Sequence, residues 1–171
     1  MASYIDQFSA ESLLVIKKPP VEAPTIVPFA TGGENNFLED RFVCFAYRYQ
    51  YADGEFSATS QFSSPAFTSG TFRFSLGSYL NEGMLNTTNA VTISYNTGGP
   101  LVKSIELLFK EYNDPTIKVI ESLNKLDLGL ANNDTATYVF ENQKIFTVLP
   151  EYEILRLYDN VPLLAKTQTL M

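Results

Sequence analysis

The sequence predicts an all-β protein, a β-sandwich with extended proline-rich and terminal segments. Its 171 residues include 13 Phe and 10 Tyr but no Trp, and this richness in aromatic residues favours strands over helices. Short stretches of alternating apolar and polar residues recur about every ten residues with turn signals between them, as in sandwiches. No long amphipathic helix pattern interrupts them, so a layered α/β arrangement is not expected.

The N-terminal part is expected to be extended. Residues 1–12 are interpreted as an arm, and residues 13–16 (LLVI) as a short apolar strand. Residues 17–28 contain four of the nine prolines. Because proline lacks the N–H that a central strand needs, this segment is predicted to be an edge strand or a linker.

Residues 41–51 are predicted to form the first long strand, with Asp53-Gly54 as a two-residue hairpin turn. A regular return strand is expected to place Phe56, Ala58, Ser60 and Phe62 on one face. Further strands are predicted at residues 71–76, 91–95, 102–111, 116–122, 135–140 and 144–149, with one helical turn within residues 123–130.

Two β-modules are the preferred domain organisation. The first spans residues 13–97, the second spans residues 98–160, and residues 161–171 form an extended C-terminal segment. The break is placed at Gly98-Gly99-Pro100, where turn-forming residues follow one strand and precede another. A single large sandwich is the alternative.

The composition excludes several classes of site. The chain has no histidine, so a Ser-His-Asp triad, a Cys-His pair and His-containing zinc sites are impossible. The single cysteine, Cys44, is interpreted as a small core residue. No glycine-rich phosphate-binding motif is present, and we expect no cofactor or metal. A net charge of −7 without a basic patch argues against nucleic-acid binding, and no secretory signal or membrane-spanning stretch is seen.

Paired carboxylates are the remaining candidates for catalysis. Glu39 and Asp40, Asp53 and Glu55, and Glu151 and Glu153 are each close in sequence, and glycosidases use two carboxylates. All of them flank turns or strand ends, where charged residues are normally solvated. We therefore expect no catalytic residue, and a glycosidase remains only a third hypothesis.

The row Tyr47, Tyr49 and Tyr51 is the best candidate for a contact surface, because tyrosine combines apolar area with a polar tip. The preferred interpretation is that these side chains form the inner wall of the sandwich. The alternative is a carbohydrate- or receptor-binding module of a phage or bacterial surface protein, which requires the three side chains to be exposed together.

Two resemblances add to this reading. The proline-rich lead-in and the FAYRYQYADGEFSATSQFS stretch are similar to fibronectin type III or immunoglobulin-like β-sandwich modules, a likeness that says little about function. The chain also resembles a segment of the large muzzle, or tail-stabilisation, proteins of crAss-like bacteriophages. The motifs that carry this second likeness are FAYRYQYADGEFSATSQFSSPAF, VTISYNTGGPLVKSIELLFKE and VLPEYEILRLYDNVPLLAKTQTLM.

The muzzle resemblance implies a non-enzymatic virion structural protein, made in the bacterial host cytoplasm and built into the phage tail. It implies copies arranged in a ring, possibly a hexamer, around the DNA exit channel, in contact with portal, ring and other tail proteins. DNA would only pass through, past an acidic wall that repels phosphate. Arg156 and Asp159, in the last motif, join the tyrosines as candidate interface residues. Family members are longer, so the native chain is expected to continue.

Overall fold

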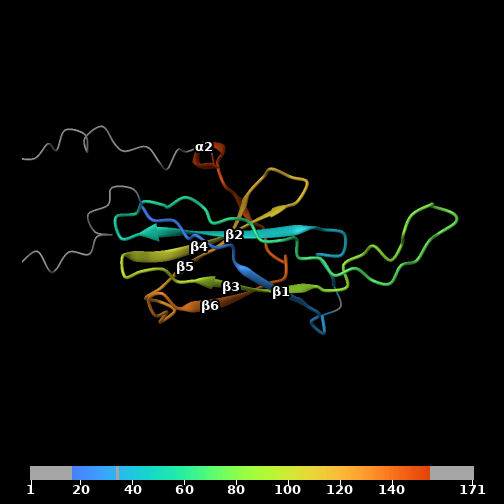
Figure 1. The fold of residues 1–171 in the computed structure, drawn as a ribbon, viewed down its shortest axis with the longest axis horizontal. Coiled ribbons are helices and arrows are strands. Elements are labelled where there is room, and N and C mark those ends of the chain that lie inside the picture. Colours follow the sequence, from blue (N-terminus) through green and yellow to red (C-terminus); the bar gives the residue numbers. More distant parts are fainter. Residues whose placement is uncertain (1–16, 34, 155–171) are drawn as a thin grey trace, which may run out of the picture.

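The computed structural model describes residues 17–33 and 35–154, which fold as two antiparallel sheets packed face to face (Figure 1). The prediction of an all-β sandwich is confirmed. Its elements are β1 (Thr25–Phe29), β2 (Val43–Tyr51), β3 (Ala90–Asn96), β4 (Val102–Glu111), β5 (Lys118–Asn124), β6 (Thr135–Phe140), β7 (Thr147–Val148) and the four-residue helix α2 (Glu151–Ile154). The expected arm 1–12, the strand 13–16 and the segment 161–171 lie outside the described residues.

Both sheets mix strands from the two halves of the chain. The three-stranded sheet has the order β1-β3-β6, and the four-stranded sheet has the order β2-β4-β5-β7. β2 pairs with β4 along its full length, and β3 pairs with β6, so pairing crosses the break expected at residues 97 and 98. The described residues therefore form one sandwich, the alternative considered above, and the glycine loop at that break is a connection within it.

The core is aromatic and is centred on the alternating residues of β2. Val43, Phe45, Tyr47, Tyr49 and Tyr51 share the inner face of the four-stranded sheet. Phenylalanine rings from other strands close against them, with Phe45 and Phe109 each about 5.1 Å from the ring centre of Phe140. The Phe45 contact is edge-to-face and the Phe109 contact is tilted, and aromatic contacts of this kind add to the stabilisation from burial alone.

The outer face of the four-stranded sheet is also covered. Ala46 and Leu108 on this face form a second buried cluster with Ile117 and Leu149, and Phe62 packs on it. Cys44 belongs to the same outer row of β2 and is only 3% exposed, so its assignment as a small core residue is confirmed. Burial raises the pKa of its thiol above the ordinary value.

Residues 56–66 do not form the regular return strand that was predicted. The turn is present, with Gly54 at φ 86°, but the returning chain pairs with β2 in steps of three residues. The backbone N–H groups of Ser57, Ser60 and Ser63 donate to the carbonyls of Tyr49, Tyr47 and Phe45 at 2.8–2.9 Å. Three residues of this segment thus span the roughly 6.8 Å of two strand residues.

The serine side chains explain this spacing. Each serine Oγ accepts the N–H of the β2 residue opposite it at 3.0 Å, replacing the carbonyl of an ordinary ladder. Each hydroxyl then donates to the carbonyl of the residue that follows the serine, at 2.8–2.9 Å. We call Ser57, Ser60 and Ser63 the serine ladder; it covers the edge of β2 without adding a strand.

Three other elements differ from the predictions. Residues 71–76 belong to neither sheet: they form one leg of the arm described below, and a turn begins at Leu76. The strand predicted at residues 144–149 is reduced to Thr147–Val148. Strand β5 continues to Asn124, so the turn within 123–130 starts later than expected, and it ends at Gly129 with φ 63°.

Candidate functional site: tyrosine cavity, buried arginine and apolar arm

The tyrosine row lies on the inner wall of the sandwich, as preferred. Tyr47, Tyr49 and Tyr51 are 3%, 6% and 3% exposed, and all three belong to the main core cluster. The joint exposure that a tyrosine-lined binding face requires is therefore not observed. Burial raises the pKa of the Tyr47 phenol above its usual value.

The hydroxyl ends of the row tie the core to two loops. The Tyr49 hydroxyl donates to the carbonyl of Asn96, the last residue of β3, at 3.2 Å. The Tyr51 hydroxyl donates to the carbonyl of Lys18 at 2.7 Å and so fixes the proline-rich segment to the end of the sandwich. These bonds satisfy polar tips that would otherwise be buried without partners.

A cavity of about 500 Å³ lies at this end of the molecule. The tyrosine row, the proline-rich residues 18–22 and the glycine loop 98–100 line it. Gly98 is required there: it has φ +68°, and a Cβ would lie 2.8 Å from Val102 and 3.0 Å from the Tyr49 ring. The walls are mostly neutral, so the cavity is chemically suited to contact through hydrogen bonds and apolar area rather than to acid–base catalysis.

Lys125 holds the glycine loop in place through its side chain. It is not among the site residues that the sequence predicts. Its Nζ donates to the carbonyls of Gly98 and Gly99, at 3.2 and 2.9 Å, and to Asn132 Oδ1 at 2.8 Å. The residue is 5% exposed, and desolvation lowers its pKa. A lysine at a strand end carries no sequence signal that distinguishes such a buried contact from ordinary solvation.

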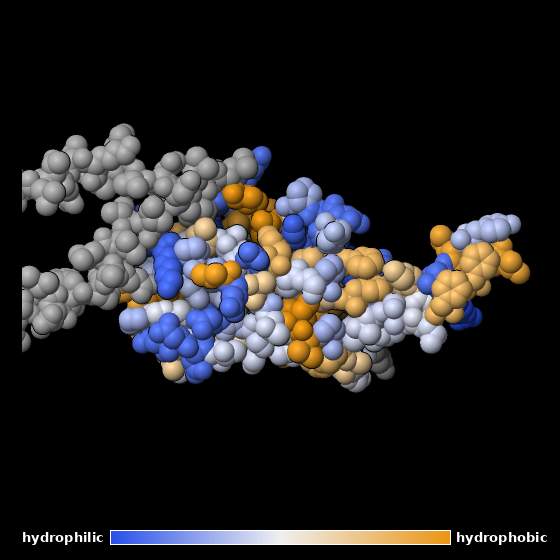
Figure 2. Space-filling view, in the orientation of Figure 1, coloured by the Kyte–Doolittle hydropathy of each residue, from blue (hydrophilic) through white to orange (hydrophobic). Residues whose placement is uncertain are grey.

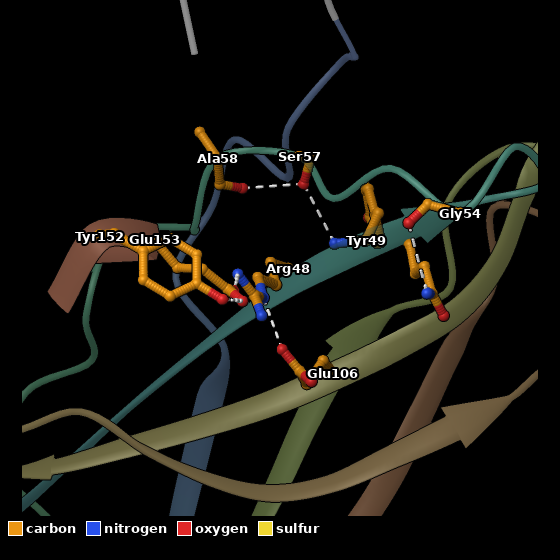
Figure 3. A network of polar contacts seen from close by, with 9 residues as sticks. Arg48, Tyr49, Gly54, Ser57, Ala58, Glu106, Tyr152 and Glu153 are labelled. Carbon is orange, nitrogen blue, oxygen red and sulfur yellow. Dashed lines mark hydrogen bonds and ion pairs between the residues drawn. The ribbon is translucent and has the colours of Figure 1, made fainter. Parts of the chain in front are cut away.

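A buried arginine organises the outer face of the four-stranded sheet (Figure 3). Arg48 Nε bonds Glu106 Oε2 of β4 at 2.5 Å, and Arg48 Nη1 pairs with Glu153 Oε2 of α2 at 2.7 Å. The Phe56 ring stacks on the guanidinium at 3.9 Å. Burial alone would lower the Arg48 pKa, but the two carboxylates outweigh it and raise the pKa.

The carboxylates nominated for glycoside hydrolysis are not brought together as a catalytic pair. Glu153 is held by Arg48, and Asp53 forms an ion pair with Lys17 while accepting the N–H of Glu55. Glu39 and Asp40 are exposed ahead of β2. In the described ranges 17–33 and 35–154, no cluster of three or more His, Cys, Asp or Glu side chains could hold a metal ion.

The most distinctive surface feature is an arm, residues 68–87, that extends from one end of the sandwich (Figure 1). Its two legs are joined by isolated bridges, Ser69 to Asn86 and Phe74 to Asn81. Asn86 fixes the base: its Oδ1 accepts the N–H groups of Thr68 and Thr88, and its own N–H donates to the Glu39 carbonyl at 2.6 Å. The legs touch at Gly83, where a Cβ would lie 1.7 Å from the Thr71 carbonyl oxygen.

The arm carries exposed apolar side chains far from the core. Figure 2 shows hydrophobic residues at the outer end of the arm, away from the body of the molecule and beside hydrophilic ones. Its exposed large side chains are Phe72 (77%), Phe74 (50%), Leu76 (81%), Tyr79 (77%), Leu80 (66%), Met84 (53%) and Leu85 (44%). Its ion pair, Arg73 with Glu82, is mostly solvated. Exposed large apolar side chains gathered in one segment are a common feature of interaction sites.

Two nominated interface residues, Arg156 and Asp159, lie outside the described residues. Within the described part of the chain, no helix is long and apolar enough to cross a membrane.

Comparison with known proteins adds no relative. No protein-family model matches the chain, and neither the curated proteins nor the solved structures include a match.

Proposed function

We propose that this chain is a non-enzymatic structural subunit of a bacteriophage tail, part of the muzzle assembly that surrounds the DNA exit channel. The observation that carries the proposal is the apolar arm. Seven of its large side chains are at least 44% exposed, although the base of the arm is fixed by a buried asparagine. The exposed side chains of such a projection fit a partner that buries them in an assembly.

The body of the molecule suits a rigid building block. Its core is rich in aromatic residues, the buried Arg48 is paired with two carboxylates, and its proline-rich entry is fixed to the core by Tyr51. Copies in a ring, possibly a hexamer, would contact each other and the portal, ring and other tail proteins through the arm. The net charge of −7 gives a channel wall along which DNA slides without adhering.

The test is peptide mapping of purified particles of the phage that encodes this sequence. We expect its peptides beside portal and capsid proteins, in a fixed ratio to them. A double variant, Phe72→Ser with Leu76→Ser, is expected to fold but not to enter particles, because both side chains are exposed on the arm. The matched control, Leu126→Ser with Ile145→Ser, removes two equally exposed apolar side chains of the body and should be incorporated normally. A chain absent from particles would refute the proposal.

The second candidate is a carbohydrate- or receptor-binding module, and the cavity at the tyrosine row is the observation that favours it. Asn96, Asn133 and the backbone of the glycine loop offer hydrogen-bonding groups beside tyrosine rings in about 500 Å³. A glycan array with the intact chain tests it, with Asn133→Ala as the variant expected to lose any binding. The absence of saturable binding to any glycan would leave only the structural proposal.

A further inference from the structure

The sandwich has four sheet edges, and three of them are protected against pairing with another chain. The edge of β2 is covered by the serine ladder. The edge at β7 is two residues long and is followed by Leu149 and Pro150. The edge at β1 contains Pro28. Coverage, shortness and proline are the devices by which natural sheets avoid edge-to-edge association.

The direction of the backbone groups shows that Pro28 faces the free edge of β1, where it blocks pairing with another strand. The N–H of Thr97 donates to the Asp134 carbonyl at 2.9 Å, in register with the pairing of β3 and β6. Hydrogen-bonded pairs alternate along an antiparallel ladder. The backbone N–H and C=O of Ile93 are therefore directed toward β6, whereas those of Thr92 and Ser94 are directed toward β1. Their partners are Val27 and Thr25, so the backbone of Ile26 and Pro28 is directed away from the sheet. Pro28 thus removes a donor from the free edge.

In the part of the chain that the structure describes, the fourth edge, β6, has no such protection. By the same alternation, Ala136 and Tyr138 bond to β3, and the backbone groups of Thr135, Thr137 and Val139 are directed outward. The Thr135 N–H is satisfied by Asp134 Oδ1. Within the described residues, no hydrogen bond reaches the outward groups of Thr137 or Val139. β6 contains neither proline nor charge, and the side chains of these two residues are exposed.

We propose that β6 is a pairing strand for a second copy of this chain, joined antiparallel about a twofold axis at Thr137. In this register Thr137 lies opposite Thr137 of the second copy, and Thr135 lies opposite Val139. The Thr137 pair gives two hydrogen bonds, and each Thr135–Val139 pair gives one because the Thr135 N–H keeps its bond to Asp134, so about four bonds join the copies and the two three-stranded sheets become one continuous sheet.

Charge and the blocked edges single out a second copy as the occupant. Each chain carries a net charge of −7. A surface that pairs with its own copy must lack an excess of either charge, because like charges on the two copies would repel each other. The three strands of this sheet, TIVPF, AVTISYN and TATYVF, contain no charged residue. Head-to-tail pairing of β6 with β1 of another copy would meet Pro28, which leaves the twofold arrangement. A cavity of about 220 Å³ beside Tyr138 and Phe140 separates β6 from the loop that follows it.

The test is sedimentation of the intact chain over roughly a hundredfold range of concentration, since dimer formation follows mass action. We expect a monomer–dimer equilibrium that tightens with salt, as repulsion between the acidic bodies is screened. Thr137→Lys places like charges opposite each other on the axis and should weaken the dimer at least about tenfold. Thr137→Pro removes one outward N–H and should have the same effect.

The matched control is Thr25→Lys. Thr25, Ser94 and Thr137 lie in one row across the sheet, so this variant adds the same charge to the same face at the opposite edge. It should leave dimerisation unchanged. Exchange of the Thr137 and Val139 amide hydrogens should slow as concentration rises.

A chain that remains monomeric, or a dimer that Thr137→Lys does not weaken, would overturn the inference. The inference does not depend on the proposed function. If Phe72→Ser with Leu76→Ser abolishes association while Thr137→Lys does not, the copies join through the arm and β6 is not the contact.

Discussion

Replacing Ser60 with alanine tests whether the serine ladder stabilises the fold. In the native chain the Ser60 Oγ accepts the Tyr47 N–H at 3.0 Å and donates to the Gln61 carbonyl at 2.9 Å. Ser60 is 4% exposed and Tyr47 is 3% exposed, so water cannot take the place of the hydroxyl at the Tyr47 N–H. Gln61 is exposed, and its carbonyl can bond water instead.

The loss is therefore dominated by one buried donor without a partner. Such a group costs about 1–3 kcal/mol, whereas a carbonyl that regains water costs little. We expect Ser60→Ala to reduce the free energy of unfolding by about 2 kcal/mol, which lowers Tm by roughly 4–8 °C in a chain of this length. Ser63→Ala should cost less, because Ser63 is only half-buried and water can take the place of its hydroxyl more easily than at Ser60.

Urea unfolding followed by tyrosine fluorescence measures this loss directly, since the chain has 10 Tyr and no Trp. Ser64→Ala is the control: Ser64 adjoins the ladder but is exposed, and it should change stability by less than about 0.5 kcal/mol. If Ser60→Ala proved no more destabilising than Ser64→Ala, the hydroxyl would not be a structural part of the ladder.

Three further predictions concern the buried arginine, the glycine loop and the core tyrosines. Arg48→Ala should lower the free energy of unfolding by about 3–5 kcal/mol, because it leaves Glu106 buried without its cation. Adding Glu106→Leu should recover part of this loss, and equal stability of the single and double variants would contradict the prediction. Gly129→Ala should lower the free energy of unfolding by about 1–2 kcal/mol through its positive φ alone, because nothing lies near the new Cβ. Gly98→Ala should lower it by at least about 1 kcal/mol more, because its Cβ would overlap Val102 and Tyr49. Chemical denaturation measures both losses. Burial raises the pKa of Tyr95 from 10.0 to about 12, so the folded state holds this proton more tightly than the unfolded state. Stability from this group is complete below pH 10 and is lost as pH rises from 10 to 12, and Tyr95→Phe should flatten that loss in unfolding curves measured across this window.

Elements set by a two-residue hydrophobic period could be predicted from the sequence. In β2, apolar residues occupy one face from Val43 to Tyr51, and the structure buries that face completely. The same alternation located β3, β4, β5 and β6. The burial of Cys44 followed from its apolar neighbours alone. In each case the side chain contacts the core of its own chain, which is the information that periodicity carries.

The serine ladder escaped prediction because its period is three and its bonds use side-chain oxygens. Read with a period of two, residues 56–62 place Ser60 on an apolar face beside Phe56 and Phe62, which suggested a strand. The spacing of Ser57, Ser60 and Ser63 was visible in the sequence, but its meaning depends on the free edge of β2, which no local pattern reveals. The Arg48 network has the same origin: Arg48, Glu106 and Glu153 are brought together only by the packing of β2, β4 and α2.

The arm and the β6 edge were missed for a different reason. Phe72, Phe74 and Leu76 have the alternation of a core strand, yet they project from the molecule, and β6 has the composition of a central strand, yet it lies at an edge. Both segments have the sequence of buried structure at positions that one chain leaves exposed. Exposed apolar arms and unprotected edges favour association, so both discrepancies support the proposals that other subunits cover these positions. The arm projects at one end of the sandwich and β6 borders one side of it, so contacts made through them would be independent, and variants of one should leave the other intact.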